Sequence, residues 1–137
     1  MAVIYGRRRI GKSTLIAEFI KDKRAIYYMA TKVGTARNTE LLAKETLRIL
    51  APALKNISFG TIEDLLSFIG ESASDEKIVF VIDEFPYWAE KDDSILSILQ
   101  KFADKEWAEK NILFILCGSA LSFMEDKVLS EKSPLFG

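Results

Sequence analysis

The first residues whose types and spacing indicate chemistry form a short loop near the start of the chain. The run Gly6-Arg7-Arg8-Arg9-Ile10-Gly11-Lys12-Ser13 matches the pattern G-x-x-x-x-G-K-[ST] in full. Glycines at both ends let the backbone turn tightly and approach an anion closely. The loop amides and the start of the following helix then form a concave anion site. The pattern predicts a phosphate-binding loop.

The side chains that end this loop have distinct expected roles. Lys12 bridges the β- and γ-phosphates of a nucleoside triphosphate, and the Ser13 hydroxyl is a ligand for Mg²⁺. Thr14 comes next, within reach of the α-phosphate. The other loop positions surround the phosphates with backbone amides; these are Gly6, Arg7, Arg8, Arg9, Ile10 and Gly11. The arginines add positive potential or point into solvent, and their individual roles stay open.

A pair of acids follows an apolar run in the middle of the chain. Ile78–Ile82 is apolar throughout and is followed by Asp83 and Glu84. An aspartate at this place binds Mg²⁺ through water, and the adjacent glutamate orients or deprotonates an attacking water as a general base. The alternative is that two acids end a strand in a solvated turn. The phosphate loop upstream favours the metal and base roles, and Glu84 favours hydrolysis over transfer to an acceptor.

Composition excludes several other chemistries. The 137 residues contain no histidine and one cysteine, Cys117. Ser-His-Asp hydrolysis, Cys-His proteolysis and His-ligated zinc sites are therefore excluded, and so is an internal disulfide. The single cysteine favours a reducing cytoplasm. The apolar runs are too short to cross a bilayer, so we expect a cytoplasmic location and no membrane partner.

Charge is nearly balanced overall but unevenly distributed. The formal net charge is −1, yet residues 1–70 hold 12 basic and 6 acidic side chains and residues 71–137 hold 7 and 14. A near-neutral chain gives no support for general nucleic-acid binding. The basic half suits a polyanion such as a triphosphate, and two solvated faces are the alternative interpretation.

Short apolar runs alternate with amphipathic segments along the chain. The apolar runs predict four strands: Ala2–Tyr5, Ala25–Ala30, Ile78–Ile82 and Ile112–Cys117. Helical spacing predicts helices over Lys12–Asp22 and Arg37–Leu50, after Thr61, after Asp93, and over Leu121–Leu129. This alternation predicts one α/β domain, residues 1–137, in which a parallel sheet has helices on both faces. Ligands of such sheets bind at the carboxyl ends of the strands.

Three finer expectations follow from local patterns. Ile16, Phe19 and Ile20 should share the buried face of the first helix. The second helix should stop before Pro52. Thr61 and Asp64 have the spacing of a capping box.

Three segments together resemble one known family. They are VIYGRRRIGKSTLI (Val3–Ile16), IVFVIDEFPYW (Ile78–Trp88) and ILFILCGSALSFM (Ile112–Met124). They resemble the archaeal-type ATPases of the AAA-related P-loop class, and the arginine run and the DEFPY turn are the specific features. The resemblance implies a three-layer α/β/α fold of the additional-strand, catalytic-glutamate kind. It places the strand that precedes Ser119 between the phosphate-loop strand and the acidic strand.

The resemblance also implies ATP and Mg²⁺ as ligands. It assigns Lys12 and Ser13 to phosphate and Mg²⁺, Asp83 to Mg²⁺ and Glu84 to water activation. It gives Ser119 the role of sensing the γ-phosphate.

Two assignments after the strands have local alternatives. The Ser119 hydroxyl also suits the N-cap of a helix beginning near Ala120, and one hydroxyl can serve both purposes. For Tyr87 and Trp88, packing is favoured over stacking on a base.

The chain is shorter than members of that family, which implies a fragment of the ATPase core. Family members carry a fifth core strand, a helical lid and a C-terminal domain after the part that this chain resembles. We therefore expect four strands, with the phosphate-loop strand at an open edge that favours self-association or a partner strand. A missing lid and arginine finger predict slow turnover in isolation.

Three functions from different classes fit these residues. The leading one is an ATPase that couples hydrolysis to a change of shape. The second is an ATP-binding switch or interaction module with negligible turnover, and the third is a small-molecule kinase. Glu84 and the lack of an arginine-rich lid after Gly118 disfavour the kinase.

Overall fold

Four parallel strands form one sheet at the centre of the protein. The computed structural model describes residues 2–5, 12–74 and 76–118. The strands are β1 (Ala2–Tyr5), β2 (Ala25–Met29), β3 (Ile78–Asp83) and β4 (Ile112–Gly118). They lie in the order β1-β4-β3-β2, and each neighbouring pair is parallel. The insertion of β4 between β1 and β3 confirms the order that the family resemblance implied.

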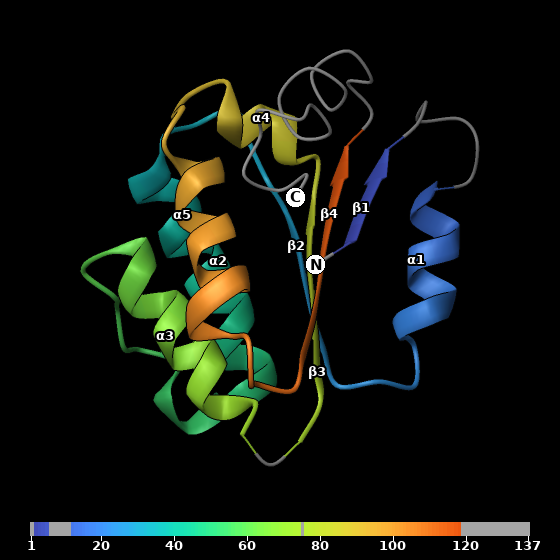
Figure 1. Ribbon diagram of the computed structural model, residues 1–137. Helices are drawn as coiled ribbons and strands as arrows, with labels where there is room; N and C mark the ends of the chain where they lie inside the picture. Colours follow the sequence, from blue (N-terminus) through green and yellow to red (C-terminus); the bar gives the residue numbers. More distant parts are fainter. Residues whose placement is uncertain (1, 6–11, 75, 119–137) are drawn as a thin grey trace.

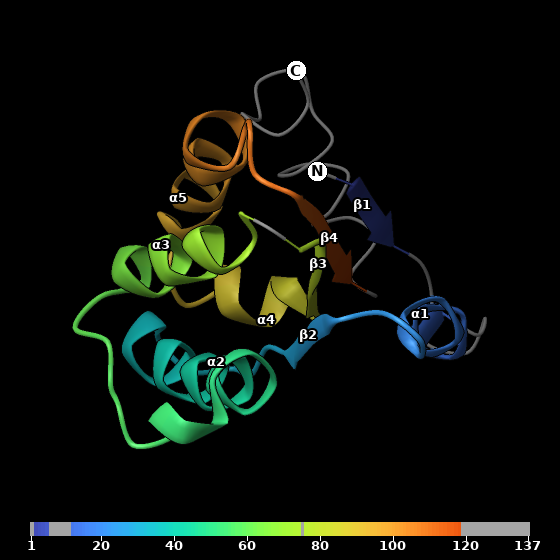
Figure 2. The same cartoon turned by 90° about the horizontal axis from the view of Figure 1, so that it is seen from below.

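Helices cover both faces of this sheet, but unequally. Helix α1 (Lys12–Ile20) lies on one face, as Figures 1 and 2 show. The other face carries the remaining described helices: α2 (Thr35–Leu50), α3 (Ile62–Ser72), α4 (Phe85–Ala89) and α5 (Ile95–Lys101). A short 3₁₀ turn, η2 (Pro52–Leu54), follows α2, and a π-helical turn, η3 (Phe102–Glu106), continues α5. The expected three-layer α/β/α architecture is therefore present.

The two faces of the sheet bury separate apolar clusters. On the α1 face, Ile16 packs with residues of β3 and β4 that alternate along each strand, namely Val79, Val81, Ile115 and Cys117. On the other face, alternate residues such as Phe80, Ile82 and Leu116 pack under α2 to α5. All six residues of β3 are buried, as expected for a central parallel strand covered on both sides.

The predicted segments form, with small shifts at their ends. Strand β2 stops at Met29, one residue before the predicted end, whereas β3 includes Asp83 and β4 includes Gly118. Helix α1 ends at Ile20 rather than at Asp22, and α2 begins at Thr35, two residues earlier than Arg37. The predicted helix over Leu121–Leu129 lies outside the described residues.

Local signals correctly mark two helix ends. Helix α2 ends at Leu50, and Ala51 takes φ −152° because the residue before a proline avoids the α region. At the start of α3, the Thr61 Oγ1 accepts a hydrogen bond from the Asp64 N–H at 3.1 Å. This contact is the Thr61 half of the predicted capping box, and it satisfies one of the unpaired amides of the first turn.

The prediction for the buried face of α1 is wrong at Phe19. Ile16 is 3% exposed, but Phe19 is 41% exposed. The reason is that α1 is the one helix on its face among those described, so its Phe19 side meets no neighbouring helix. The Lys23 ammonium instead lies 4.3 Å from the centroid of the Phe19 ring, a cation–π contact at the surface.

Strand β1 lies at one edge of the sheet that the described residues form. Among the described residues, β1 pairs with β4 and with no other strand. None of the helices in the described ranges combines the length and the apolar character needed to cross a membrane.

Candidate active site

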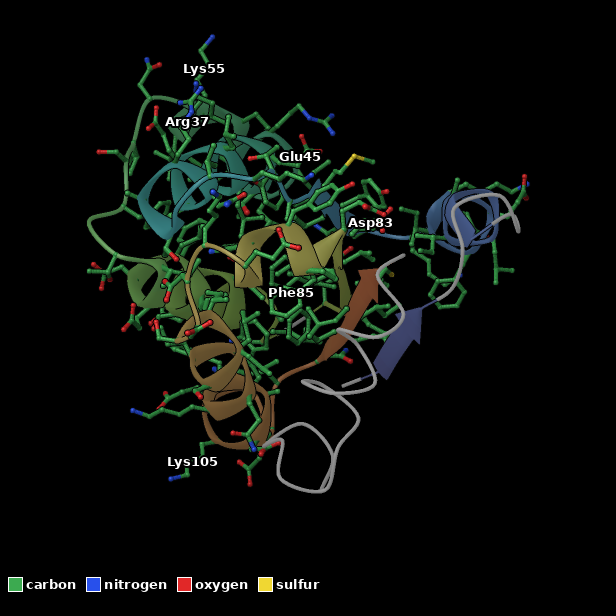
Figure 3. The ribbon with its side chains drawn as sticks, turned by 90° about the horizontal axis from the view of Figure 1, so that it is seen from above. Arg37, Glu45, Lys55, Asp83, Phe85 and Lys105 are labelled. Carbon is green, nitrogen blue, oxygen red and sulfur yellow. The ribbon has the colours of Figure 1, made fainter. Side chains whose placement is uncertain are left out.

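The carboxyl ends of the strands gather the predicted site residues at one end of the sheet. Tyr5, the last residue of β1, pairs with Gly118 of β4. On the other side of β4, Ile82 of β3 pairs with Leu116, so Asp83 lies one residue further along. The end of β1 and the acidic pair are thus separated by the width of one strand. Figure 3 looks onto this end of the sheet and shows Asp83 between α4 and α1.

Asp83 is a buried carboxylate, and each of its two oxygens accepts a hydrogen bond. The residue is 1% exposed. Its Oδ1 accepts a hydrogen bond from the Glu84 backbone N–H at 2.8 Å, and its Oδ2 accepts one from the Tyr27 hydroxyl. Val79 and Val81 of the same strand face α1, and alternation along β3 places Asp83 on that face too. The carboxylate therefore lies on the side of the sheet where α1 begins.

Tyr27 reaches Asp83 from the neighbouring strand. Tyr27 pairs with Val81, and Met29 pairs with Asp83, so Tyr27 and Asp83 are diagonal neighbours on one face. Burial, and next the hydrogen bond to the Asp83 carboxylate, raise the pKa of the Tyr27 phenol well above its ordinary value. The phenol is therefore protonated at neutral pH and acts as the donor.

Glu84 has an unusual backbone conformation. Its φ of 53° and ψ of 36° lie in the left-handed region, and it is the only non-glycine residue with positive φ in the described part of the chain. This conformation costs a residue with a side chain about 1–2 kcal/mol. Glu84 is also 7% exposed. Backbone strain of this kind is common at functional sites. Here the left-handed conformation of Glu84 turns the chain sharply from β3 into α4.

Helix α4, which the sequence patterns did not predict, is fixed to α2 by a hydrogen-bonded chain. The Trp88 indole N–H donates to Thr35 Oγ1 at 2.9 Å, and the Thr35 hydroxyl donates to Asp92 Oδ2. The backbone N–H of Ser94 donates to Asp92 Oδ1 at 2.9 Å. Hydrogen bonds from Ser94 and then from Thr35 hold the pKa of Asp92 below its usual value. The turn that carries the acidic pair is therefore supported on its α4 side.

The aromatic residues of this turn pack against protein. Trp88 is fully buried and meets the Tyr28 ring edge-on, with centroids 6.2 Å apart. Tyr87 is half-buried, and the Lys32 ammonium lies 4.7 Å from the centroid of its ring. For Trp88, the predicted preference for packing over base stacking is confirmed.

The phosphate loop itself lies largely outside the described residues. This holds for Gly6, Arg7, Arg8, Arg9, Ile10 and Gly11, and also for Ser119. The described chain resumes at Lys12, and Lys12, Ser13 and Thr14 form the first turn of α1. A helix that begins at the lysine of the G-x-x-x-x-G-K-[ST] pattern is the expected context of a phosphate-binding loop.

Asp83 fits the ligand chemistry of Mg²⁺. Its carboxylate oxygens are hard ligands of the kind that Mg²⁺ prefers. The residue also lies at the end of the sheet where β1 leads toward the predicted loop. Among the described residues, no three His, Cys, Asp or Glu side chains converge into a site that would hold a metal by themselves. Mg²⁺ that binds together with a nucleotide needs only one or two carboxylates, because phosphate oxygens and waters complete its shell.

The largest feature missed by the sequence analysis is Tyr27. Neither its type nor its neighbours mark it as a site residue. The available signal was its position, two residues before the end of a strand and on the same face as the acid that ends the adjacent strand. That signal is usable only when the strand register is known.

A cavity elsewhere in the protein does not include these residues. It has a volume of about 700 Å³ and lies between α2 and the segment leading into α3, where Thr39, Lys44, Ile57 and Phe59 contribute to its wall. Neither Asp83 nor Glu84 lines it.

Comparison with known sequences places these observations in a family. A family model described as an ATPase domain predominantly from Archaea matches residues 1–137. The uncharacterized protein MJECL04 of Methanocaldococcus jannaschii is 31% identical over 135 residues, which cover 98% of this chain and 28% of that protein. A second protein of the same organism, uncharacterized protein MJ0424, is 36% identical over 66 residues, or 48% of this chain and 63% of that protein.

Solved structures share the fold. The Walker-type ATPase PABY2304 of Pyrococcus abyssi has a TM-score of 0.66 and 20% identity, and the match covers 99% of this chain and 45% of that one. Cdc6p from Pyrobaculum aerophilum has a TM-score of 0.66 and 19% identity over 99% of this chain and 36% of that one. Drosophila ORC bound to DNA has a TM-score of 0.67 and 17% identity over 96% and 34%. The chain thus spans less than half of each of these three proteins, and the likeness shows a P-loop ATPase fold.

Proposed function

Since the chain belongs to the family of ATPase domains found predominantly in Archaea, we propose that it binds ATP with Mg²⁺ and hydrolyses the nucleotide, with a change of shape. The observation that carries this proposal is the position of Asp83 and Glu84. Asp83 ends the fully buried central strand β3 and Glu84 follows it directly, one strand away from the strand that leads into the phosphate-loop pattern. A solvated turn, the alternative reading of two adjacent acids, does not agree with their burial.

Each residue of the site has a role in this proposal. Lys12 neutralises charge on the β- and γ-phosphates, and Ser13 and Asp83 hold the metal. Mg²⁺ held there would supply positive charge to offset the charge that develops on the phosphoryl oxygens. Glu84 orients the attacking water and accepts its proton. Its backbone is fixed by the turn into α4, so its position needs little adjustment when substrate binds.

Further contacts complete the proposed nucleotide site. Ser119 follows the last residue of β4, which suits a hydroxyl that contacts the γ-phosphate. Thr14 is proposed to touch the α-phosphate, and the amides of residues 6–11 to surround the phosphates.

The proposal predicts that Lys12→Ala weakens binding of Mg-ATP. The change removes one charge-assisted contact to phosphate, which should cost about 1.5–3 kcal/mol of binding free energy. Isothermal titration calorimetry on the 137-residue chain measures this difference.

A lysine just beyond the same helix provides the control. Lys21 lies 3.0 Å from the Glu18 carboxylate, and both side chains are about two-thirds exposed, so Lys21→Ala should leave ATP affinity unchanged. Equal affinities for wild type and Lys12→Ala would contradict the proposed site.

A further inference from the structure

We propose that Tyr27 is a positioning residue, which holds the Asp83 carboxylate in the orientation that Mg²⁺ binding with ATP requires. This inference rests on the function proposed above. It starts from one contact, in which the Tyr27 hydroxyl donates to Asp83 Oδ2 across the β2–β3 pair. The two residues lie 56 positions apart in the chain, so the contact exists only in the folded sheet.

Each of the two oxygens of the Asp83 carboxylate accepts a hydrogen bond. Oδ1 accepts from the Glu84 N–H at 2.8 Å, and Oδ2 accepts from Tyr27. A donor on one oxygen alone leaves the carboxylate able to turn about its Cβ–Cγ bond, whereas donors on both oxygens fix that torsion. A carboxylate oxygen accepts more than one hydrogen bond, so the phenol contact is compatible with a water-mediated contact to a metal.

The burial of Asp83 makes the loss of its hydrogen bond from Tyr27 costly. Asp83 is 1% exposed, so bulk water does not easily replace a lost donor. A buried carboxylate that loses a donor is destabilised or reoriented. Hydrogen-bond partners of metal ligands typically change metal affinity about 10- to 100-fold when they are removed. Tyr27 therefore meets the physical requirements of such a partner.

The adjacent tyrosine provides a matched control. Tyr28 points to the opposite face of β2, into the cluster under α2 and α4, where its hydroxyl donates to Asn38 Oδ1. Tyr27→Phe and Tyr28→Phe each remove one phenol oxygen from the same strand and keep the ring. Only the first removes a donor from Asp83. Because Tyr27 is half-buried and retains its ring as phenylalanine, the fold should persist, which circular dichroism and a thermal melt verify.

The test measures how ATP affinity depends on Mg²⁺, without any turnover. A fluorescent, non-hydrolysable ATP analogue is titrated with protein in EDTA and then at increasing Mg²⁺ concentrations. In Tyr27→Phe, the Mg²⁺ concentration at half-maximal enhancement should rise about 10-fold or more, while affinity in EDTA stays at the wild-type value. Tyr28→Phe should keep the wild-type Mg²⁺ midpoint.

A double-mutant cycle assigns the effect to Asp83. In an Asp83→Asn background, adding Tyr27→Phe should produce no further shift in the Mg²⁺ midpoint. Wild-type binding with an unchanged midpoint in Tyr27→Phe overturns this inference and leaves the proposed function intact. An equal shift in Tyr28→Phe, or the full shift in the Asp83→Asn background, overturns it as well. If the wild-type chain binds the analogue neither in EDTA nor with Mg²⁺, the proposed function fails, and this inference fails with it.

Discussion

At the scale of single residues, Glu84 combines burial, charge and an unfavourable backbone conformation. Its φ of 53° is one that side chains other than Asn, Asp and Gly seldom adopt. Asparagine or glycine would relieve the conformation, yet the chain carries a glutamate that is 7% exposed. The backbone N–H of this same residue donates to Asp83. Backbone strain at a buried charged residue is typical of functional sites, which agrees with the proposed role of Glu84 as a general base.

We predict that Glu84→Gln removes hydrolysis and keeps nucleotide binding. Glutamine retains the size, the polarity and the backbone N–H that reaches Asp83, but it does not accept a proton from water. General-base catalysis contributes about 10²–10⁴-fold, so kcat should fall by that order while ATP affinity changes little. Phosphate-release kinetics and calorimetry measure the two quantities.

Glu90 offers the control for this change. It is exposed at the end of α4, and Glu90→Gln should leave both quantities unchanged. A Glu84→Gln variant that hydrolyses ATP at the wild-type rate would rule out the base role. Negligible hydrolysis by the wild type would favour the switch module instead.

At the scale of elements, helix α3 is joined to the sheet through an indole that rests on a glycine. The indole N–H of Trp107 donates a hydrogen bond to the Leu66 carbonyl oxygen at 3.1 Å. A Cβ at Gly70 would lie 2.8 Å from the Trp107 Nε1 and 2.9 Å from its Cδ1. Beneath α3, the Trp107 ring meets Phe80 and Phe114 with centroids 5.9 and 5.4 Å apart. The glycine therefore allows the indole to contact helix and strands together.

Gly70→Ala should destabilise the protein. Alanine favours a helix interior by up to about 1 kcal/mol relative to glycine, but forcing atoms into a packed interface costs about 1–3 kcal/mol. The second effect should win, because the Trp107 ring is confined by its hydrogen bond and by two aromatic neighbours. We expect a net loss of about 1–2 kcal/mol in the free energy of unfolding, measured by urea denaturation.

The matched control is another glycine that has space. A Cβ at Gly60 would meet only the Asp64 Oδ2 at 3.8 Å, which is ordinary contact, so Gly60→Ala should change stability by less than about 0.5 kcal/mol. A Gly70→Ala variant as stable as wild type would show that Trp107 moves aside easily.

At the scale of the whole molecule, the β1 edge of the sheet bears on association with another chain. Strand β1 pairs with β4 and with no other strand in the described residues. Its outer side then carries backbone N–H and C=O groups that suit pairing with another strand. Since β1 leads into the phosphate-loop pattern, a strand added at this edge would also lie next to the proposed nucleotide site.

We predict that the isolated 137-residue chain self-associates through the β1 edge. A further strand on the outer side of β1, where the described residues place none, would supply main-chain hydrogen bonds to that side. Sedimentation velocity over a concentration series should show the weight-average mass rising with concentration. A mass that stays at the monomer value of 15.5 kDa throughout the series would contradict the prediction.

The order of the residues alone determined the local features of the protein and part of the site. Apolar runs mark the strands, because central parallel strands are buried on both faces. Pro52 marks the end of α2 and Thr61 the start of α3, since each acts on its nearest backbone groups. Asp83 and Glu84 were predicted because they directly follow an apolar run and a phosphate-loop pattern lies upstream. The loop residues and Ser119 stay predictions, as they lie outside the described part of the chain.

Tertiary structure decided what depends on register and on which face is covered. The contact of Tyr27 with Asp83 spans 56 positions and follows from the pairing of β2 with β3. The turn after β3 is held to α2 through Trp88 and Thr35, and within that turn Glu84 takes a left-handed conformation against its local preference. Phe19 is exposed because no described helix lies beside α1. Each outcome depends on whether a segment distant in the sequence lies beside the residue, and spacing within one segment carries no information about that.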